Sequence, residues 1–263
     1  MRKNYHNAII AALILITAVQ ALLIFIFLKR PAEKIAIHKP LPAAVKAKIA
    51  IVLDDWGYKQ GNLEALKQNP YPLTLAVLPN LPFSKRVCEY GHSLGKEIIL
   101  HLPMEPHEVV NLEKNTIMTS MDDKSIAEIL ALDLDSIPYV KGVSNHMGSK
   151  AVEDKNTISG VFKEIRKRKL YFLDSYVTLK SVCSEYALSM RIPLARRDVF
   201  LDNEQDPSYI RKQLYNLKIK ALKQGSAVGI GHDRKNTLLV LREVMPELEK
   251  EGYKFVFVSD LVR

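Results

Sequence analysis

The chain lacks the features that mark several classes of protein. Its 263 residues include two cysteines, one tryptophan and eleven glycines, and no internal repeat or low-complexity stretch is visible. This composition excludes a small fold held by disulfides, a collagen-like repeat and a disordered chain. The two cysteines, Cys88 and Cys183, lie far apart, and the sequence leaves open whether they form one disulfide or remain two buried thiols.

Acidic residues are scarce only near the N-terminus. Residues 1–48 contain eight Lys and Arg side chains and one acid, Glu33, whereas the remaining 215 residues contain 30 basic and 28 acidic side chains. The net charge of +9 therefore belongs mainly to the first segment. Because the main domain is nearly neutral, it has no field that would attract a polyanion, and we expect no nucleic-acid partner.

One run of the sequence has no charged residue. Residues 8–28 include only two polar side chains, Thr17 and Gln20. At about 1.5 Å per helical residue, this run spans roughly 30 Å, the thickness of a bilayer hydrocarbon core. The run ends in bulky residues rather than a small-residue cleavage site, so residues 1–30 are predicted to be a transmembrane anchor or uncleaved signal. Residues 31–47, rich in Pro, Ala and Lys, are predicted to be an extended tether.

Residues 48–263 are predicted to form one α/β domain. Short β-branched runs alternate with helical patterns, which is typical of parallel strands covered by helices. About seven such units favour barrel-like closure over an open sheet. The strand candidates are residues 49–53, 73–78, 97–100, 141–144, 170–173, 227–230 and 254–258. Helices are predicted over about 83–93, 120–134, 206–224 and 236–252, with caps at Ser120, Asp206 and Asn236 and a kink or break at Pro246.

Ionisable side chains follow several of the predicted strands. In parallel α/β folds the ligand site lies beyond the carboxyl ends of the strands, so these side chains are expected to meet at one rim. Burying so many ionisable groups is costly unless they pair or bind a metal ion. The candidates are Asp54, Asp55, His101, Asn145, His146, Asp174 and His232, and Asp202 is left as a structural or supporting residue.

These residue types suit metal-assisted hydrolysis of an amide or ester. One carboxylate and two imidazoles form a three-ligand site for zinc or another divalent ion. A second carboxylate can take a proton from water, and a histidine across the site can protonate the leaving group. Each residue taken alone has a structural alternative, such as a turn, a helix cap or a hydrogen-bonded scaffold.

Seven motifs occur together in the predicted domain, and they carry a family resemblance. They read IVLDDWG, LAVLPN, EIILHLPMEP, NHMGSK, YFLDS, RRDVFLDN and GIGHD. Over residues 48–263 the chain resembles the divergent polysaccharide deacetylase family, a branch of the polysaccharide deacetylase and carbohydrate esterase superfamily. The resemblance implies a distorted barrel and a metal-dependent hydrolase that removes acetyl groups from an N- or O-acetylated glycan of the cell envelope.

The resemblance also implies roles for individual side chains. Asp54 resembles the catalytic base and His232 the general acid, whereas Asp55 and His101 resemble two of the metal ligands. Trp56 follows the aspartate pair and can stack on a sugar ring, with packing in the core as an equal alternative.

One position departs from the family pattern. The second metal histidine of the family would fall at Glu105, so either Glu105 binds the ion or His146 supplies the second imidazole, and we favour His146. The arginine that orients the base is also missing, and Arg196 or Arg197 can substitute. These departures leave an alternative function, a non-catalytic glycan-binding or envelope-scaffold protein on the same barrel.

Asp174, at the end of the predicted strand 170–173, is a candidate to orient one of the imidazoles through a hydrogen bond.

The implied substrate also indicates a compartment. Glycans of this type lie outside the cytoplasm, so the resemblance implies a membrane-anchored domain in the periplasm or at the cell surface. Basic residues flank both ends of the apolar run, and the positive-inside rule therefore does not decide its orientation.

Overall fold

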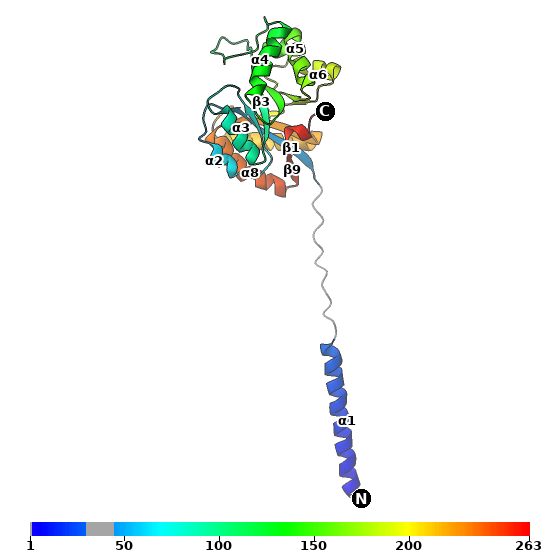
Figure 1. The fold of residues 1–263 in the computed structure, drawn as a ribbon. Helices are drawn as coiled ribbons and strands as arrows, with labels where there is room; N and C mark the ends of the chain where they lie inside the picture. Colours follow the sequence, from blue (N-terminus) through cyan, green and yellow to red (C-terminus); the bar gives the residue numbers. More distant parts are fainter. Residues whose placement is uncertain (1, 30–44) are drawn as a thin grey trace. The chain divides into compact units, whose positions relative to one another are not determined.

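The computed structural model describes residues 2–29 and 45–263 (Figure 1). The chain divides into two units, of which the second, Ala44–Arg263, contains all the strands. Helix α1 (Arg2–Leu28) covers the apolar run. The membrane-spanning helix predicted there is not found: among the helices of the described residues, none combines the length and the apolarity needed to cross a bilayer. The predicted tether lies, up to residue 44, outside the described residues.

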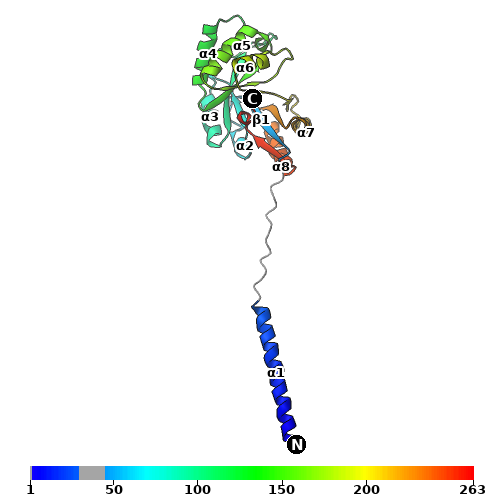
Figure 2. The same ribbon diagram turned by 90° about the vertical axis from the view of Figure 1, so that its right-hand side faces the viewer.

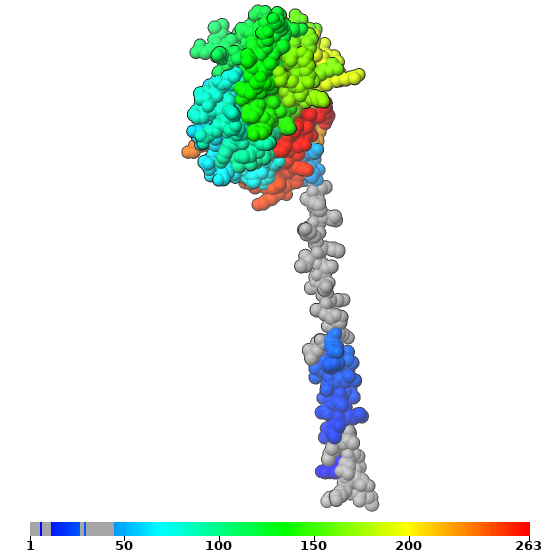
Figure 3. Space-filling view, in the orientation of Figure 1, coloured from blue at the N-terminus to red at the C-terminus, as the bar shows by residue number. Residues whose placement is uncertain are grey.

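Nine parallel strands form the sheet of the domain. Their order is β6-β5-β4-β3-β2-β1-β8-β7, and β9 pairs with the first half of β1. The strands are β1 (Ala47–Trp56), β2 (Thr74–Val77), β3 (Glu97–Met104), β4 (Val140–Met147), β5 (Tyr171–Asp174), β6 (Leu194–Arg196), β7 (Val199–Phe200), β8 (Ser226–His232) and β9 (Tyr253–Val256). The β1–β9 pair brings the last residues of the domain (red in Figure 3) beside its first residues (blue). All seven predicted strands are confirmed, whereas β6 and β7 are too short to give an apolar run in the sequence.

The sheet curls into a distorted barrel that stays open at one place. β6 pairs with β5 and β7 pairs with β8, but β6 and β7 do not pair with each other. We call this opening between β6 and β7 the seam. Arg197 lies in the two-residue connection between β6 and β7, and its side chain holds the loop after β5: its Nε donates to the carbonyl of Ser175 at 2.6 Å and its Nη2 donates to that of Tyr176 at 2.7 Å. The predicted barrel is therefore correct as a parallel α/β barrel with an incomplete ladder.

Helices cover the outer face of the sheet. They are α2 (Leu63–Lys67), α3 (Ser84–Ser93), α4 (Asp123–Asp135), α5 (Lys155–Lys167), α6 (Cys183–Met190), α7 (Pro207–Gln224) and α8 (Lys235–Lys250), with short 3-10 turns at η1 (Ala151–Glu153) and η2 (Val258–Asp260). Figures 1 and 2 show α4, α5 and α6 grouped at one end of the domain and α2 and α8 at the other.

Helix ends follow the capping chemistry of the sequence in part. Asp206 caps α7 by accepting a hydrogen bond from the backbone of Tyr209, and Gly225 ends it in the left-handed region at φ 83°. The predicted cap of α4 is displaced by two residues, since Asp122 rather than Ser120 accepts from a backbone N–H of the first turn.

Helix α8 differs from the sequence prediction at two positions. Asn236 lies inside the helix, because the residue before the first turn is Arg234. Pro246 also lies inside the helix, which continues to Lys250 without a break. The neighbours Val244 and Leu248 are buried in the core, and this packing offsets the hydrogen bond that a proline cannot donate.

Alternate residues of each strand face two different cores. One core lies between the sheet and the helices, and the other fills the barrel. The barrel core, which we call the inner cluster, consists of Ala50, Val52, Ala76, Ile99, Tyr171, Leu173, Ala195, Val228, Ile230, Val256 and Val258. Cys88 and Cys183 are buried as free thiols, so the alternative of two unpaired cysteines is correct.

Candidate metal centre

The strand alternation directs side chains into the mouth of the barrel, where the strands have their carboxyl ends. On β1 the inner residues Ala50 and Val52 are followed two positions later by Asp54. In the same way, Ile99 on β3 is followed by His101 and Ile230 on β8 by His232. Because the side-chain period of a strand is two, these three polar groups belong to the inner face of the barrel.

A backbone irregularity brings a second carboxylate to the mouth. Asp55 has φ 64°, in the left-handed region, and the pairing of β1 with β2 shifts register between Leu53 and Trp56. Asp54 and Asp55 therefore both reach the mouth, although they are consecutive. The same shift turns Trp56 into the core between sheet and helices, where it is fully buried.

Asp55, His101 and His146 converge on one point. The Oδ1 atom of Asp55 lies 3.2 Å from Nδ1 of His146 and 3.4 Å from Nε2 of His101. The three possible ligand atoms lie within 4.8 Å of one another. One carboxylate oxygen and two imidazole nitrogens are a donor set that divalent zinc and its neighbours accept. Burial would raise the pKa of Asp55, but the hydrogen bonds from the two histidines outweigh it and hold the pKa well below its usual range.

The ring of His101 is oriented by a neighbouring strand. Its Nδ1 lies 2.8 Å from Oγ of Ser144, which is its register partner on β4. This contact leaves Nε2 facing Asp55. A hydrogen bond at the far ring nitrogen fixes the tautomer and orientation of a metal-binding histidine, so Ser144 completes the arrangement. The sequence analysis did not identify Ser144.

Asp54 lies behind the three converging groups. Its Oδ2 is 3.6 Å from Nε2 of His101. Its Oδ1 is buried and has no hydrogen-bond partner among the described residues. Burial raises the pKa of Asp54, although nearby His101 opposes this. An unpaired, buried carboxylate oxygen beside a carboxylate–imidazole set fits a site that holds a cation and a water molecule.

His232 faces the same cavity and has a carboxylate partner. Its Nδ1 lies 2.7 Å from Oδ1 of Asp202, and its Nε2 lies 4.0 Å from Oδ2 of Asp55. Asp202 is fully buried and accepts a further hydrogen bond from Thr237 at 2.6 Å. Burial lowers the pKa of His232, but the contact with Asp202 outweighs it and raises the pKa above its ordinary value. The supporting role that the sequence left open for Asp202 is therefore correct.

These groups line one cavity of about 160 Å³, which we call the site cavity. Its lining residues are Asp54, Asp55, His101, Asn145, His146, Met147, Ser175, Val177, Phe200 and His232. They come from β1, β3, β4, β7 and β8 and from the loop after β5. The rim that the sequence predicts from strand ends therefore exists. Six of its seven candidate side chains line this one cavity, and Asp174 is the exception.

Glu105 does not join this group. Its Oε1 accepts a hydrogen bond from Nζ of Lys150 at 2.6 Å, and its Oε2 accepts from the backbone and hydroxyl of Thr119 at 2.6 and 2.7 Å. Both carboxylate oxygens are thus engaged away from the site cavity. Of the two alternatives for the second nitrogen or oxygen ligand, the geometry favours His146 over Glu105.

Trp56 follows the second of the two alternatives that the sequence left open, packing in the core, and Asp174 does not have the role that the sequence suggests. Trp56 is buried in the core and cannot stack on a sugar. Asp174 belongs to the outer face of β5, and its oxygens accept from the backbone of Tyr176 and the hydroxyl of Ser181, both at 2.7 Å. It therefore orients the loop after β5 rather than an imidazole.

Asn145 and the two arginines shape the loops around the site cavity. Asn145 accepts a hydrogen bond from the backbone of Ser175 at 2.8 Å and thereby holds the loop after β5. Arg196 lies over the ring of Tyr176, at 4.3 Å from its centroid. Arg197 bonds two backbone carbonyls of the loop after β5. Neither arginine bonds Asp54 in these contacts, so the expected substitution for a base-orienting group is not confirmed, although the charge of Asp54 helps to keep Arg197 charged.

The fold and the site together define a class of protein: parallel α/β barrels with a carboxylate–imidazole site at the carboxyl ends of the strands. The model of the family described as divergent polysaccharide deacetylase matches residues 51–262, and the chain belongs to this family. The resemblance found in the sequence is confirmed.

Individual relatives agree with this assignment. The chain is 33% identical over 217 residues to "Uncharacterized protein YibQ" of Escherichia coli strain K12, covering 82% of this chain and 67% of that protein. The crystal structure of uncharacterized protein ATU2773 from Agrobacterium tumefaciens C58 is similar at a TM-score of 0.80 and 26% identity, covering 85% of this chain and 92% of that one. A shorter match, 40% over 55 residues, is to a peptidoglycan-N-acetylglucosamine deacetylase of Bacillus cereus, covering 20% of this chain and 26% of that protein.

Proposed function

We propose that this protein is a metal-dependent hydrolase that removes acetyl groups from an N- or O-acetylated glycan of the cell envelope. The observation that carries the proposal is the convergence of Asp55, His101 and His146, whose ligand atoms lie within 4.8 Å of one another. Family membership supports a carbohydrate substrate. The name of the Bacillus cereus relative supports an envelope glycan.

The proposed mechanism assigns a task to each side chain. Asp55, His101 and His146 hold the ion, and zinc suits this donor set. When bound there, a divalent ion polarises an acyl oxygen and lowers the pKa of water. Asp54 accepts the proton of the attacking water, a task that its unpaired Oδ1 and its raised pKa suit.

His232 acts at the other end of the reaction. Attack of water on the acyl carbon forms a C–O bond, and the bond from that carbon to the sugar nitrogen or oxygen then breaks. His232 gives its proton to this leaving amine or alkoxide. Its pKa is raised by Asp202, so the ring carries the proton at neutral pH more often than an isolated histidine would.

Metal content tests the ligand assignment. The full-length wild type is expected to bind about one divalent ion per chain, and His101→Ala and His146→Ala are expected to lose it. His107→Ala is a matched control, because His107 is exposed and pairs with Glu153 rather than with the site. Equal metal content in all four proteins, measured by mass spectrometry after dialysis, would reject the ligands.

Acetate release tests the reaction. The wild type is expected to release acetate from chitin oligosaccharides or peptidoglycan fragments, and Asp54→Asn to be slower by about 10²–10⁴-fold with its metal retained. The alternative function, a non-catalytic glycan-binding protein, drew its support from Glu105 at the position of the second histidine. Because His146 lies 3.2 Å from Asp55 and can supply the second imidazole, Glu105 at that position no longer favours the non-catalytic alternative. Glycan binding without any acetate release would favour the non-catalytic alternative.

We also propose that the domain works outside the cytoplasm, because acetylated envelope glycans lie there. Alkaline phosphatase becomes active only outside the cytoplasm, so a fusion of this enzyme to the C-terminus of the full chain tests the location. An active fusion supports the proposal, and an abundant but inactive fusion contradicts it.

A further inference from the structure

A second cavity shares a wall with the site cavity. Its volume is about 500 Å³, and Asp55 and His232 line both spaces. Its other lining residues come from the loops after β1 and β7 and from the start of α8, and they are Tyr58, Lys59, Gln205, Asp233, Arg234 and Lys235. We call this space the basic cavity. Because Asp55 and His232 belong to both walls, a group held in the basic cavity lies directly beside the proposed reacting group.

Two of the three basic side chains of this cavity have no acidic partner. Lys59 and Lys235 are exposed, and neither ammonium group forms an ion pair with a carboxylate of the described residues. Arg234 is held more firmly, since its Nη1 donates to the carbonyl of Asp202 at 2.5 Å and lies 3.8 Å from Oδ1 of that residue. A guanidinium has five N–H donors, so most of those of Arg234 stay available to a ligand.

The acidic side chains of the same wall are engaged elsewhere. Asp233 is buried, and its Oδ1 accepts a hydrogen bond from Nδ2 of Asn62 at 2.6 Å. Asp55 faces the two histidines of the candidate metal centre. The first turn of α8, which begins at Lys235, contains no acidic residue, and no side chain caps it. Positive charge therefore prevails in the basic cavity.

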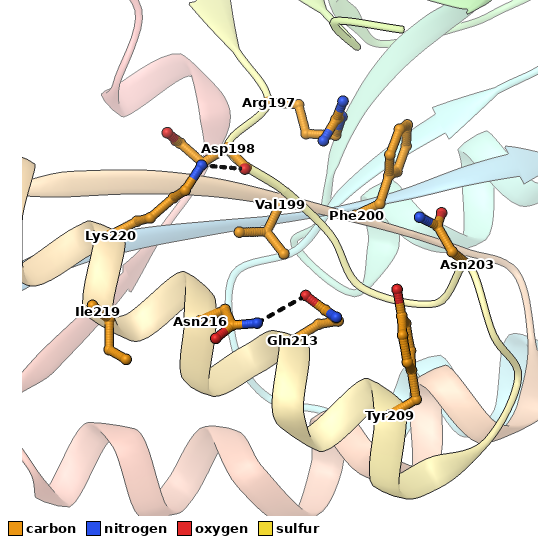
Figure 4. A pocket seen from close by; sticks show the side chains of 10 residues that line it. All are labelled: Arg197, Asp198, Val199, Phe200, Asn203, Tyr209, Gln213, Asn216, Ile219 and Lys220. Atoms are coloured by element: carbon orange, nitrogen blue, oxygen red, sulfur yellow. Dashed lines mark hydrogen bonds between the residues drawn. The ribbon is translucent and has the colours of Figure 1, made fainter.

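The cavity between β7 and α7 differs in this respect (Figure 4). Its volume is about 620 Å³, and it shares a single lining residue, Phe200, with the site cavity. Its basic side chains are already bonded: Lys220 donates to the carbonyl of Asp198 at 2.8 Å, and Arg197 donates to two carbonyls of the loop after β5. Of these two spaces, the basic cavity is the one that places unpaired positive charge beside the site.

The charge of the basic cavity is a local feature. Residues 49–263 contain 30 basic and 28 acidic side chains, so the domain as a whole is nearly neutral. Ammonium and guanidinium groups bind carboxylates and phosphates through charge-assisted hydrogen bonds, which are about twice as strong as those between neutral groups. Gln205 adds an amide that can bond to sugar hydroxyls. A sugar that carries an acidic group matches both kinds of lining.

We propose that the basic cavity binds an acidic group of the substrate, a carboxylate or a phosphate on the reacting sugar or on its neighbour, so that the protein acts on acidic glycans in preference to neutral ones. Lys59 and Lys235 pair with the acid, and the Arg234 guanidinium fixes its position. This inference rests on the proposed function, since it names the class of substrate for the same site.

Binding tests the basic cavity independently of turnover. The probes are N-acetylglucosamine, N-acetylglucosamine 6-phosphate and N-acetylmuramic acid, titrated calorimetrically into full-length protein carrying Asp54→Asn. At least one of the two acidic sugars is expected to bind about tenfold or more tightly than the neutral one, and the pair shows whether a phosphate or a carboxylate is accepted. Equal affinity for all three sugars would overturn the inference.

Charge removal tests which residues hold the acid. Lys59→Gln/Lys235→Gln is expected to bind the acidic sugars no more tightly than N-acetylglucosamine. Lys67→Gln/Lys254→Gln is the matched control, because it removes the same charge from two exposed lysines that line neither cavity. The control is expected to keep the preference for the acidic sugar. An equal preference in both double variants would overturn the inference.

Inorganic phosphate distinguishes a substrate site from attraction of any anion. A substrate site uses the sugar as well as the acid, so inorganic phosphate is expected to bind at least about tenfold more weakly than the acidic sugar that the cavity accepts. Equal affinity would mean that the cavity attracts anions of any kind, and it would overturn the inference.

Turnover separates this inference from the proposed function. The wild type is expected to release acetate from the accepted acidic sugar with a higher kcat/KM than from N-acetylglucosamine. Equal values overturn the inference and leave the proposed function intact. Tighter binding of an acidic sugar that depends on Lys59 and Lys235, with no acetate released from any probe, rejects the proposed function and supports the basic cavity.

Discussion

Asp54 and Asp55 are neighbours in the chain, yet the backbone gives their carboxylates different partners. Asp54 follows the strand alternation into the barrel, whereas Asp55 leaves it at φ 64° and meets two histidines. A left-handed backbone is uncommon for residues other than glycine, and asparagine and aspartate tolerate it best. Asp55→Asn is therefore the substitution that removes the charge with the least change to the backbone.

Asp202 sets the protonation of His232, and this predicts a shifted pH profile. Because Asp202 raises the pKa of His232, Asp202→Asn is expected to lower that pKa. A general acid works in its protonated form, so the alkaline limb of the rate profile should move to lower pH. Glu204→Gln, an exposed carboxylate in the same loop, is the control. A limb that does not move in Asp202→Asn would remove His232 from the role of acid.

Glu105 is predicted to stabilise the fold and not the ion. Glu105→Gln should lower the free energy of unfolding at pH 7 by about 1–2 kcal/mol, because its charge-assisted hydrogen bonds to Lys150 and Thr119 weaken. Burial raises the pKa of Glu105, but these contacts outweigh it and lower the pKa. The extra stability of the wild type should therefore be present above the unfolded pKa, near 4.3, and should disappear as the pH falls through the lower folded value.

Urea unfolding at several pH values measures this difference. Metal content provides the second readout, and it is expected to equal that of the wild type. Loss of the ion from Glu105→Gln would show that the carboxylate is a ligand after all.

At the scale of the strands, alternation explains which sequence predictions succeed. Asp54, His101 and His232 fall on the same parity as the inner cluster, and each reaches the mouth of the barrel. Asp174 follows Phe172, an outer residue, so the same rule could have excluded it from the site. Trp56 has the sequence parity of the inner cluster but lies in the outer core, because the register shift at Asp55 reverses the alternation, and no residue pattern in the sequence predicts that shift.

The contact between β4 and β5 depends on a missing side chain. Gly142 is the register partner of Tyr171, and a Cβ at Gly142 would lie 2.5 Å from its ring. The ring cannot move away easily, since Tyr171 is buried and its hydroxyl donates to Glu97 at 2.9 Å. Gly142→Ala is therefore expected to lower the free energy of unfolding by about 1–3 kcal/mol.

Gly61→Ala is the matched control for this substitution. No described atom lies within 4 Å of the Cβ that it would add, and the expected change is within about 0.5 kcal/mol. Urea unfolding monitored by circular dichroism compares the two variants. Equal stability of both would show that the sheet has room at Gly142.

For the whole molecule, the sequence is enough to predict the class of fold and the side chains that converge at the mouth of the barrel. The sequence is not enough to predict the residues that hydrogen-bond to these side chains and orient them. Ser144 reaches His101 because the two are register partners on β3 and β4, and Asp202 reaches His232 because β7 lies beside β8. Strand order and register follow from contacts between distant segments, and β7, at two residues, leaves no periodic signal.

The seam also affects how the barrel can adapt. In a closed barrel, a wider entrance requires two neighbouring strands to separate and every amide bond between them to break. Here the connection between β6 and β7 is held to the end of β5 and the loop after it by the Arg197 guanidinium and by the backbone N–H of Arg197, which donates to the carbonyl of Asp174. The shape of the mouth at this point therefore depends on the contacts of one residue, Arg197, rather than on a ladder of paired strands.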